Sequence, residues 1–162
     1  MTLAELNGLD PARAETEFRR CCGSARWARG MVEARPFVSL EAMIGEGDAC
    51  WAALAPEDWL EAFAAHPEIG EQKPVSAWST GEQAGMASAA EDVRARLAAL
   101  NAAYRSRFGY IFIVCATGKS PEDMLLMLEA RLSNTPAIEL RIAADEQRKI
   151  TGLRLAKLMG DA

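Results

Sequence analysis

Apolar residues recur at helical spacing along most of this chain, and residues that start or stop helices separate the periodic stretches. Asp10–Pro11 combines an N-cap residue with a proline at the first helical position, which predicts a helix running to Cys22. Ser24 and Ser39 each cap a further helix. The first of these two ends before Pro36, because proline disfavours helical geometry in the residue before it.

Two more helices are predicted in the middle of the chain, with a loop between them. Pro56 opens the first, and His66–Pro67 ends it. Ser79–Glu82 has the S-x-x-E form of a capping box and begins a long helix that ends near Tyr104. Apolar positions at helical spacing are Trp59, Leu60 and Phe63 in the first helix and Met86, Val93, Leu97 and Leu100 in the second.

Residues 108–116 are a run of β-branched and aromatic side chains that, taken alone, is typical of a buried strand. The sequence contains no second run of this kind, and a lone strand cannot satisfy its own backbone groups. We therefore expect a buried extended or irregular segment here, followed by a turn at Thr117–Lys119.

The last two helices are predicted from Ser120 to Leu132 and from Asn134–Pro136 to Met159. Glu146 is expected to project from the middle of an apolar face of the final helix, where a carboxylate needs a partner. Lys149 or Arg131 could supply it. The expected members of that face are Ile138, Ile142, Ile150 and Leu153.

Composition fits this pattern. The 162 residues, 50% of them apolar and 25% charged, are enough for one packed domain. We predict an all-α, single-domain bundle, residues 1–162, of about 7–8 helices with one irregular apolar segment near 108–116. The net charge of −5 comes from interspersed charges without a basic block, so nucleic acid is not an expected partner.

Cellular context is suggested by three features. No apolar stretch is long enough to span a bilayer, and the N-terminus lacks the pattern of a secretory signal. Cys21, Cys22, Cys50 and Cys115 form neither a C-x-x-C pair nor a zinc-binding pattern. We expect a cytoplasmic protein with reduced thiols, no membrane attachment and no metal site.

Two titratable residues are candidates for chemistry. His66 is the only histidine, and imidazole suits general acid/base catalysis, but a histidine at a helix end can also be a simple cap. Glu82 is the third helical residue of its capping box, where a glutamate ordinarily bonds back to its own cap. Ser79, Glu82 and Gln83 nevertheless surround a helix N-terminus that can hold an anion. Position alone does not decide between these interpretations.

Four ordered motifs cover most of the chain: His66–Gly70, Ser79–Gln83, Phe108–Ala116, and Arg131–Asn134 followed by Glu139, Glu146, Lys149 and Ile150. In this order they resemble the 2-oxo-4-hydroxy-4-carboxy-5-ureidoimidazoline (OHCU) decarboxylase family. The resemblance implies an all-helical, often dimeric enzyme that catalyses the last step from urate to (S)-allantoin. It also implies that neither a metal nor an organic cofactor takes part.

The resemblance also implies roles. His66 matches the family's essential acid/base histidine and Glu82 its essential glutamate. Many members have proline before the phenylalanine where this chain has Ile111, which leaves the register of the backbone contacts open. Substrate contacts are expected from Pro67, Ser79, Thr80, Gly81, Gln83 and Arg131 and from the backbone of Phe112, Ile113, Val114, Cys115 and Ala116.

Two alternatives stay open. The chain could be a non-enzymatic helical binding module in which His66 is only a cap, or an enzyme of this fold that acts on another ureido acid or imidazoline. Polar residues at two helix ends beside a buried apolar run favour a small concave site. The expected ligand is a small anion, and the expected assembly is a homodimer.

Overall fold

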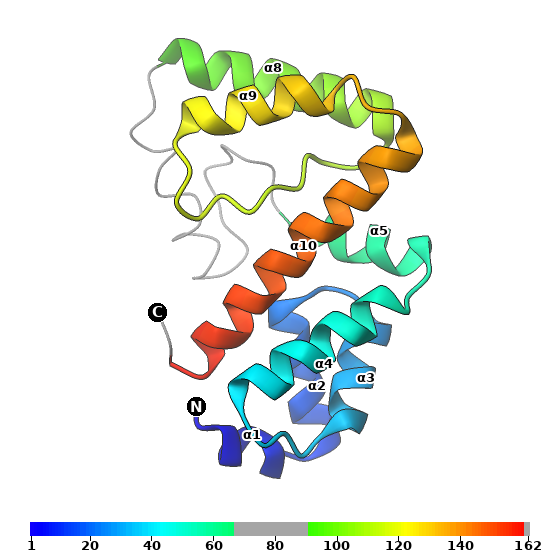
Figure 1. The fold of residues 1–162 in the computed structure, drawn as a ribbon, viewed down its shortest axis with the longest axis vertical. Helices are drawn as coiled ribbons and strands as arrows, with labels where there is room; N and C mark the ends of the chain where they lie inside the picture. The colour runs from blue at the N-terminus through cyan, green and yellow to red at the C-terminus, as the bar shows by residue number, and fades with distance from the viewer. Residues whose placement is uncertain (67–90, 161–162) are drawn as a thin grey trace. The chain divides into compact units, whose positions relative to one another are not determined.

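The computed structural model describes residues 1–66 and 91–160, and within them eight helices and no strand are present (Figure 1). The predicted all-α class is confirmed. The chain divides into two compact units, Met1–Ala62 with Gln147–Ala162, and Phe63–Glu146. The prediction of one domain over residues 1–162 stays a prediction.

The first unit begins with α1 (Leu3–Gly8), α2 (Pro11–Cys21), α3 (Ala25–Ala34) and α4 (Leu40–Ala52). The predicted caps are confirmed, because the side chains of Asp10, Ser24 and Ser39 each accept a hydrogen bond from a backbone N–H three residues on. Helix α1 was not predicted, although Thr2 and Glu5 form a capping box at its start. Helix α5 (Pro56–Ala64) follows and contributes residues to both units.

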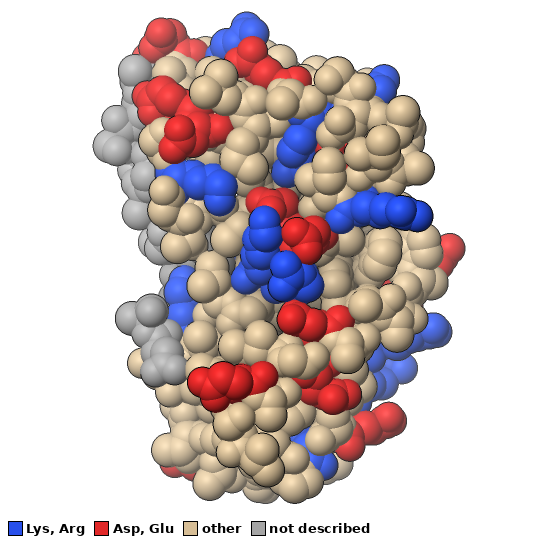
Figure 2. Space-filling view, in the orientation of Figure 1, with Lys and Arg blue, Asp and Glu red and all other residues tan. Residues whose placement is uncertain are grey.

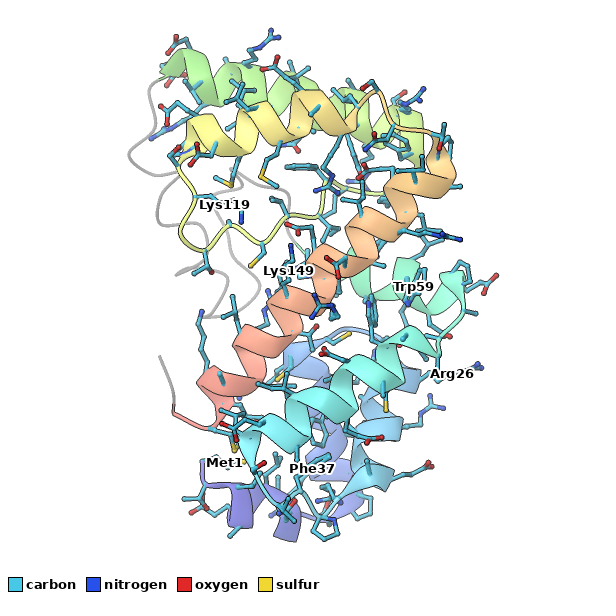
Figure 3. The ribbon with its side chains drawn as sticks, viewed as in Figure 1. Met1, Arg26, Phe37, Trp59, Lys119 and Lys149 are labelled. Atoms are coloured by element: carbon cyan, nitrogen blue, oxygen red, sulfur yellow. The ribbon has the colours of Figure 1, made fainter. Side chains whose placement is uncertain are left out.

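Trp27 organises the core of the first unit. Its ring meets Phe18 edge-on at a centroid distance of 6.1 Å, and its Nε1–H donates to the Gly47 carbonyl at 3.0 Å. A Cβ at Gly47 would lie 3.4 Å from that ring, so the glycine lets α4 approach the tryptophan closely. Trp59, labelled in Figure 3, also packs against Trp51, and its Nε1–H donates to the Trp51 carbonyl at 3.0 Å.

The second unit contains α8 (Glu91–Phe108), α9 (Pro121–Arg131) and the first part of α10 (Pro136–Leu158). Helices α8 and α9 lie side by side, and the irregular segment passes beneath them in Figure 1. Helix α8 ends at Phe108 rather than near Tyr104, where Gly109 takes a positive φ of 87°. The buried members of the core cluster are Leu97, Tyr104, Phe112, Val114, Met124 and Leu128.

The buried face of α10 differs from the predicted apolar face. Ile138 and Leu153, expected on one apolar face, are 52% and 41% exposed, so that face is not the buried one. Ile150 is buried as predicted. Polar residues that bond to neighbouring groups fill much of the buried face, which apolar periodicity cannot reveal. These buried polar residues are Glu139, Glu146, Gln147, Thr151 and Arg154.

The surface carries mixed charge. Figure 2 shows lysine and arginine side chains interspersed with aspartate and glutamate over the face in view. Among the helices in the described ranges, none is both long enough and apolar enough to cross a membrane.

Candidate active site

The irregular segment at residues 111–116 is the central element of the candidate site. Ile111 to Cys115 are buried, and the side chains of Phe112 and Val114 belong to the core cluster between α8 and α9. The chain then turns at residues 117–118, where the Lys119 N–H donates to the Ala116 carbonyl at 3.0 Å and Gly118 takes a φ of 78°. The predicted buried, irregular segment and the predicted turn are confirmed.

Arg131, the last residue of α9, holds this segment from one side. Its Nη1 donates to the Ile113 carbonyl at 2.7 Å, and its guanidinium carbon lies 4.5 Å from the centroid of the Phe112 ring. Nε and Nη2 donate to Oε2 of Glu139 at 2.8 and 2.5 Å. The described contacts of Arg131 therefore tie the irregular segment to α10.

Glu139 completes a buried polar cluster that sequence reasoning did not find. Its side chain is fully buried, and besides Arg131 it accepts hydrogen bonds from the Tyr104 hydroxyl and from Nδ2 of Asn134. Burial and the bond to Glu139 raise the pKa of Tyr104, so the phenol stays protonated as a donor. The only trace of this cluster in the sequence was the Arg131–Asn134 motif followed by Glu139. The pattern alone did not show which residues bond to Glu139.

Glu146 lies about two helical turns after Glu139 on α10 and bonds to the same segment. Its Oε1 accepts the Cys115 N–H at 3.0 Å, and the carboxylate is buried. The Cys115 carbonyl accepts a hydrogen bond from Nζ of Lys119 at 2.8 Å, a residue labelled in Figure 3. The interpretation of Arg131 as the partner of Glu146 was wrong, because the arginine pairs with Glu139.

His66 is the one proposed catalytic residue in the described ranges. It is half-buried, follows the end of α5, and donates its backbone N–H to the Phe63 carbonyl at 3.2 Å. Like residues 112–116 and Arg131, it belongs to the second unit. The structure brings Arg131 together with Phe112 and Ile113. The remaining predicted site residues, Pro67, Ser79, Thr80, Gly81, Glu82 and Gln83, lie outside the described residues.

Cys21 and Cys22 are not activated nucleophiles. All four cysteines are free thiols, as predicted. Burial raises the pKa of Cys21 to about 12 and that of Cys22 to about 11, so both stay protonated at neutral pH. Within residues 1–66 and 91–160, no group of three or more histidine, cysteine, aspartate or glutamate side chains is arranged to hold a metal ion.

Solved structures of known proteins share this fold. A solved structure described as OHCU decarboxylase in the presence of (S)-allantoin superimposes with a TM-score of 0.80 and 39% identity, covering 90% of this chain and 98% of that one. A structure of (S)-allantoin synthase shares the fold, with a TM-score of 0.75 at 21% identity. The described helices thus form the all-α fold of a solved decarboxylase.

Sequence comparison identifies the family. The OHCU decarboxylase family model matches residues 7–156, and this chain belongs to that family. It is 28% identical over 160 residues to 2-oxo-4-hydroxy-4-carboxy-5-ureidoimidazoline decarboxylase of Haloferax volcanii, covering 97% of this chain and 95% of that protein. It is also 41% identical over 158 residues to the uric acid degradation bifunctional protein TTL of Arabidopsis thaliana, of which it spans about half, 48%.

Proposed function

We propose that this protein decarboxylates OHCU to (S)-allantoin, the last step in the degradation of urate to allantoin. One observation carries the proposal: nearly the whole chain, at 39% identity, follows the fold of an OHCU decarboxylase solved in the presence of that product. The second activity of the longer bifunctional relatives is not part of the proposal, because this chain spans about half, 48%, of the Arabidopsis protein.

The chemistry of the substrate explains why no cofactor is needed. The carbon that bears the carboxylate is adjacent to a C=N bond, so the electron pair left by departing CO₂ delocalises into the ring. An organic cofactor would ordinarily supply that electron sink. The protein therefore needs to hold the substrate, polarise it and deliver one proton to the reacting carbon.

His66 and Glu82 are the proposed catalytic residues. Glu82 orients or deprotonates the 4-hydroxyl group and destabilises the departing carboxylate, while His66 handles the proton at the reacting carbon. Protonation from one face accounts for a single enantiomer of the product. The position of His66 directly after α5, with its backbone bonded to Phe63, supports a fixed placement of this residue.

The proposed binding residues fall into two groups. The first group is the backbone of residues 112–116, a segment that Arg131 and Glu146 hold through Ile113 and Cys115. The bonds of Arg131 to Ile113 and Glu139 support a positioning task for it, and its direct contact with substrate stays a prediction. The second group consists of Pro67, Ser79, Thr80, Gly81 and Gln83, which lie outside the described residues.

The decisive experiment generates the unstable substrate in place, from urate, with the two preceding enzymes, and follows the optical activity of allantoin by circular dichroism. Added wild-type protein should give (S)-allantoin faster than the uncatalysed reaction. Racemic allantoin at the uncatalysed rate would reject the decarboxylase. A melting temperature that rises with ligand, without turnover, would favour the binding module instead.

Variants then test the two roles. His66→Ala and Glu82→Ala should each lower kcat by about 10²-fold or more with unchanged helicity, because proton transfer groups contribute that much. The matched control is Glu129→Ala, which removes an exposed carboxylate paired with Arg96 and should keep full activity. Loss of helicity in His66→Ala or Glu82→Ala would instead support the capping interpretation.

The proposal also includes a cytoplasmic location and a homodimeric assembly. The resemblance to a family whose members are often dimeric supports the second. Light scattering coupled to size-exclusion chromatography should give twice the 17.6 kDa mass of one chain. A mass of 17.6 kDa at micromolar concentration would contradict the dimer.

A further inference from the structure

Three backbone groups of the irregular segment are bonded along one edge. The Ile113 carbonyl accepts from Arg131 at 2.7 Å, and the Cys115 N–H donates to Glu146 at 3.0 Å. The Cys115 carbonyl accepts from Lys119 at 2.8 Å. All three groups belong to alternate residues of the segment, and each bonds to a charged side chain.

In an extended chain, the N–H and C=O of alternate residues point to the same edge, and those of the residues between them point to the other edge. The bonds of Ile113 and Cys115 therefore leave the groups of Phe112 and Val114 on the opposite edge. Within the described residues, the backbone N–H and C=O of Val114 make no hydrogen bond, although this residue is only 6% exposed. A buried amide without a partner is a ready binding group.

The core fixes this arrangement. The side chains of Phe112 and Val114 pack into the cluster with Leu97 and Leu128, so the segment cannot shift by one residue without exposing them. Glu146 alone determines the bonding of the Cys115 N–H in the described structure. A one-residue change of register would bring a different amide to Glu146 and reverse the two edges.

We propose that Glu146 is a positioning residue. By accepting the Cys115 N–H, it keeps the backbone N–H and C=O groups of Phe112 and Val114 on the edge that bonds to the substrate. This deepens the proposed function and rests on it. The ring of OHCU contains an N–H beside a C=O, and one residue of an extended edge offers the matching acceptor and donor. Ile113 and Cys115 then make no backbone contact with the substrate, which resolves the register that the sequence left open.

Amide hydrogen exchange measured by NMR on the ¹⁵N-labelled wild-type protein tests this directly, with (S)-allantoin as the probe. Without ligand, the Cys115 amide should exchange more slowly than the Val114 amide, because it is bonded to Glu146. Saturating (S)-allantoin should slow the Val114 amide by about tenfold or more and leave Cys115 unchanged. Slowing of the Cys115 amide with no change at Val114 would overturn the proposal.

A pair of variants isolates Glu146. Glu146→Gln keeps an oxygen that accepts the Cys115 N–H, so it should keep the Val114 protection by (S)-allantoin and a KM near that of the wild type. Glu146→Leu removes the acceptor and should lose that protection and raise KM by about tenfold. Equal behaviour of the two variants would refute the positioning task.

A destabilised control separates positioning from loss of stability. Met43→Ala removes a fully buried side chain in the other unit, so it should lower the melting temperature while every residue of the segment's own unit stays unchanged. It should retain Val114 protection by (S)-allantoin, and loss of that protection in this control would also refute the proposal. Wild-type turnover is measured first: absence of decarboxylation rejects the proposed function, whereas the exchange pattern of Cys115 and Val114 decides the role of Glu146 separately.

Discussion

Buried charge in the second unit is concentrated on Arg131, Glu139 and Glu146. Removing a charge from water is costly unless bonds to other groups replace those to water. Glu139 receives such bonds from Arg131, Tyr104 and Asn134. The sequence shows these charged residues but not which of them pair. By pattern alone, Arg131 could bond to either Glu139 or Glu146.

Loss of one partner in the Arg131–Glu139 pair should be costly. Glu139→Leu leaves the guanidinium of Arg131 buried without its carboxylate and should lower the free energy of unfolding by about 3–5 kcal/mol. Urea denaturation followed by circular dichroism measures the change. The control Glu129→Leu breaks an exposed pair with Arg96 and should cost less than about 1 kcal/mol. Similar costs for the two variants would contradict a tightly bonded buried pair.

Cys22 should make stability depend on alkaline pH. Burial raises its pKa from 9.0 to about 11, so the folded protein binds the thiol proton more tightly than the unfolded chain. This contribution to stability is fully present below pH 9 and is lost as the pH rises toward 11.

Urea denaturation at pH 8 and pH 10.5 gives the loss of unfolding free energy between these two pH values. This loss should be smaller in Cys22→Ser than in the wild type by about 1–2 kcal/mol. Cys50→Ser is the matched control. It should alter the loss of unfolding free energy between the two pH values less than Cys22→Ser does, because the Cys50 thiol is less buried and burial therefore raises its pKa less. The same pH dependence in wild type and Cys22→Ser would contradict the assignment.

At the scale of elements, the starts of four helices were predictable, whereas helix α1, the end of α8 and the buried face of α10 were not. The caps Asp10, Ser24, Ser39 and Ser120 mark the starts of four helices, because each side chain satisfies a backbone N–H that the helix leaves open. The face of α10 could not be read in the same way. Its interior uses polar residues, and two of their partners are distant in sequence: Glu139 accepts from Tyr104, and Glu146 accepts from the Cys115 N–H.

Two glycines in different elements should respond oppositely to the same substitution. Gly118 takes a φ of 78° in the turn after the irregular segment, so Gly118→Ala should cost about 1–2 kcal/mol of stability. Gly45 lies inside α4, and a methyl group added to it would meet no other atom within 4 Å, so Gly45→Ala should stabilise the protein by up to about 1 kcal/mol. Thermal denaturation measures both changes, and a shift of the same sign in both would contradict the described backbone.

At the scale of the whole molecule, α10 is the element that both compact units use. Residues up to Glu146 belong to the second unit, and residues from Gln147 onward belong to the first. An uninterrupted helix is cooperative, so unfolding of either unit removes the packing that stabilises half of α10. This connectivity favours the sequence prediction of a single folding domain, which the division into compact units leaves open.

Fluorescence can test that cooperativity, because Trp27, Trp51 and Trp59 all lie in the first unit. In a Trp78→Phe background, we expect Leu128→Ala, which empties a fully buried site in the second unit, to cost about 2–5 kcal/mol. If the chain is one domain, the tryptophan transition in urea should move to lower concentration together with the circular dichroism transition. Met43→Ala, a buried substitution in the first unit, is the reciprocal control.

A tryptophan transition that Leu128→Ala leaves in place would show that the units unfold separately, and residues 1–162 would then be two domains joined by α10.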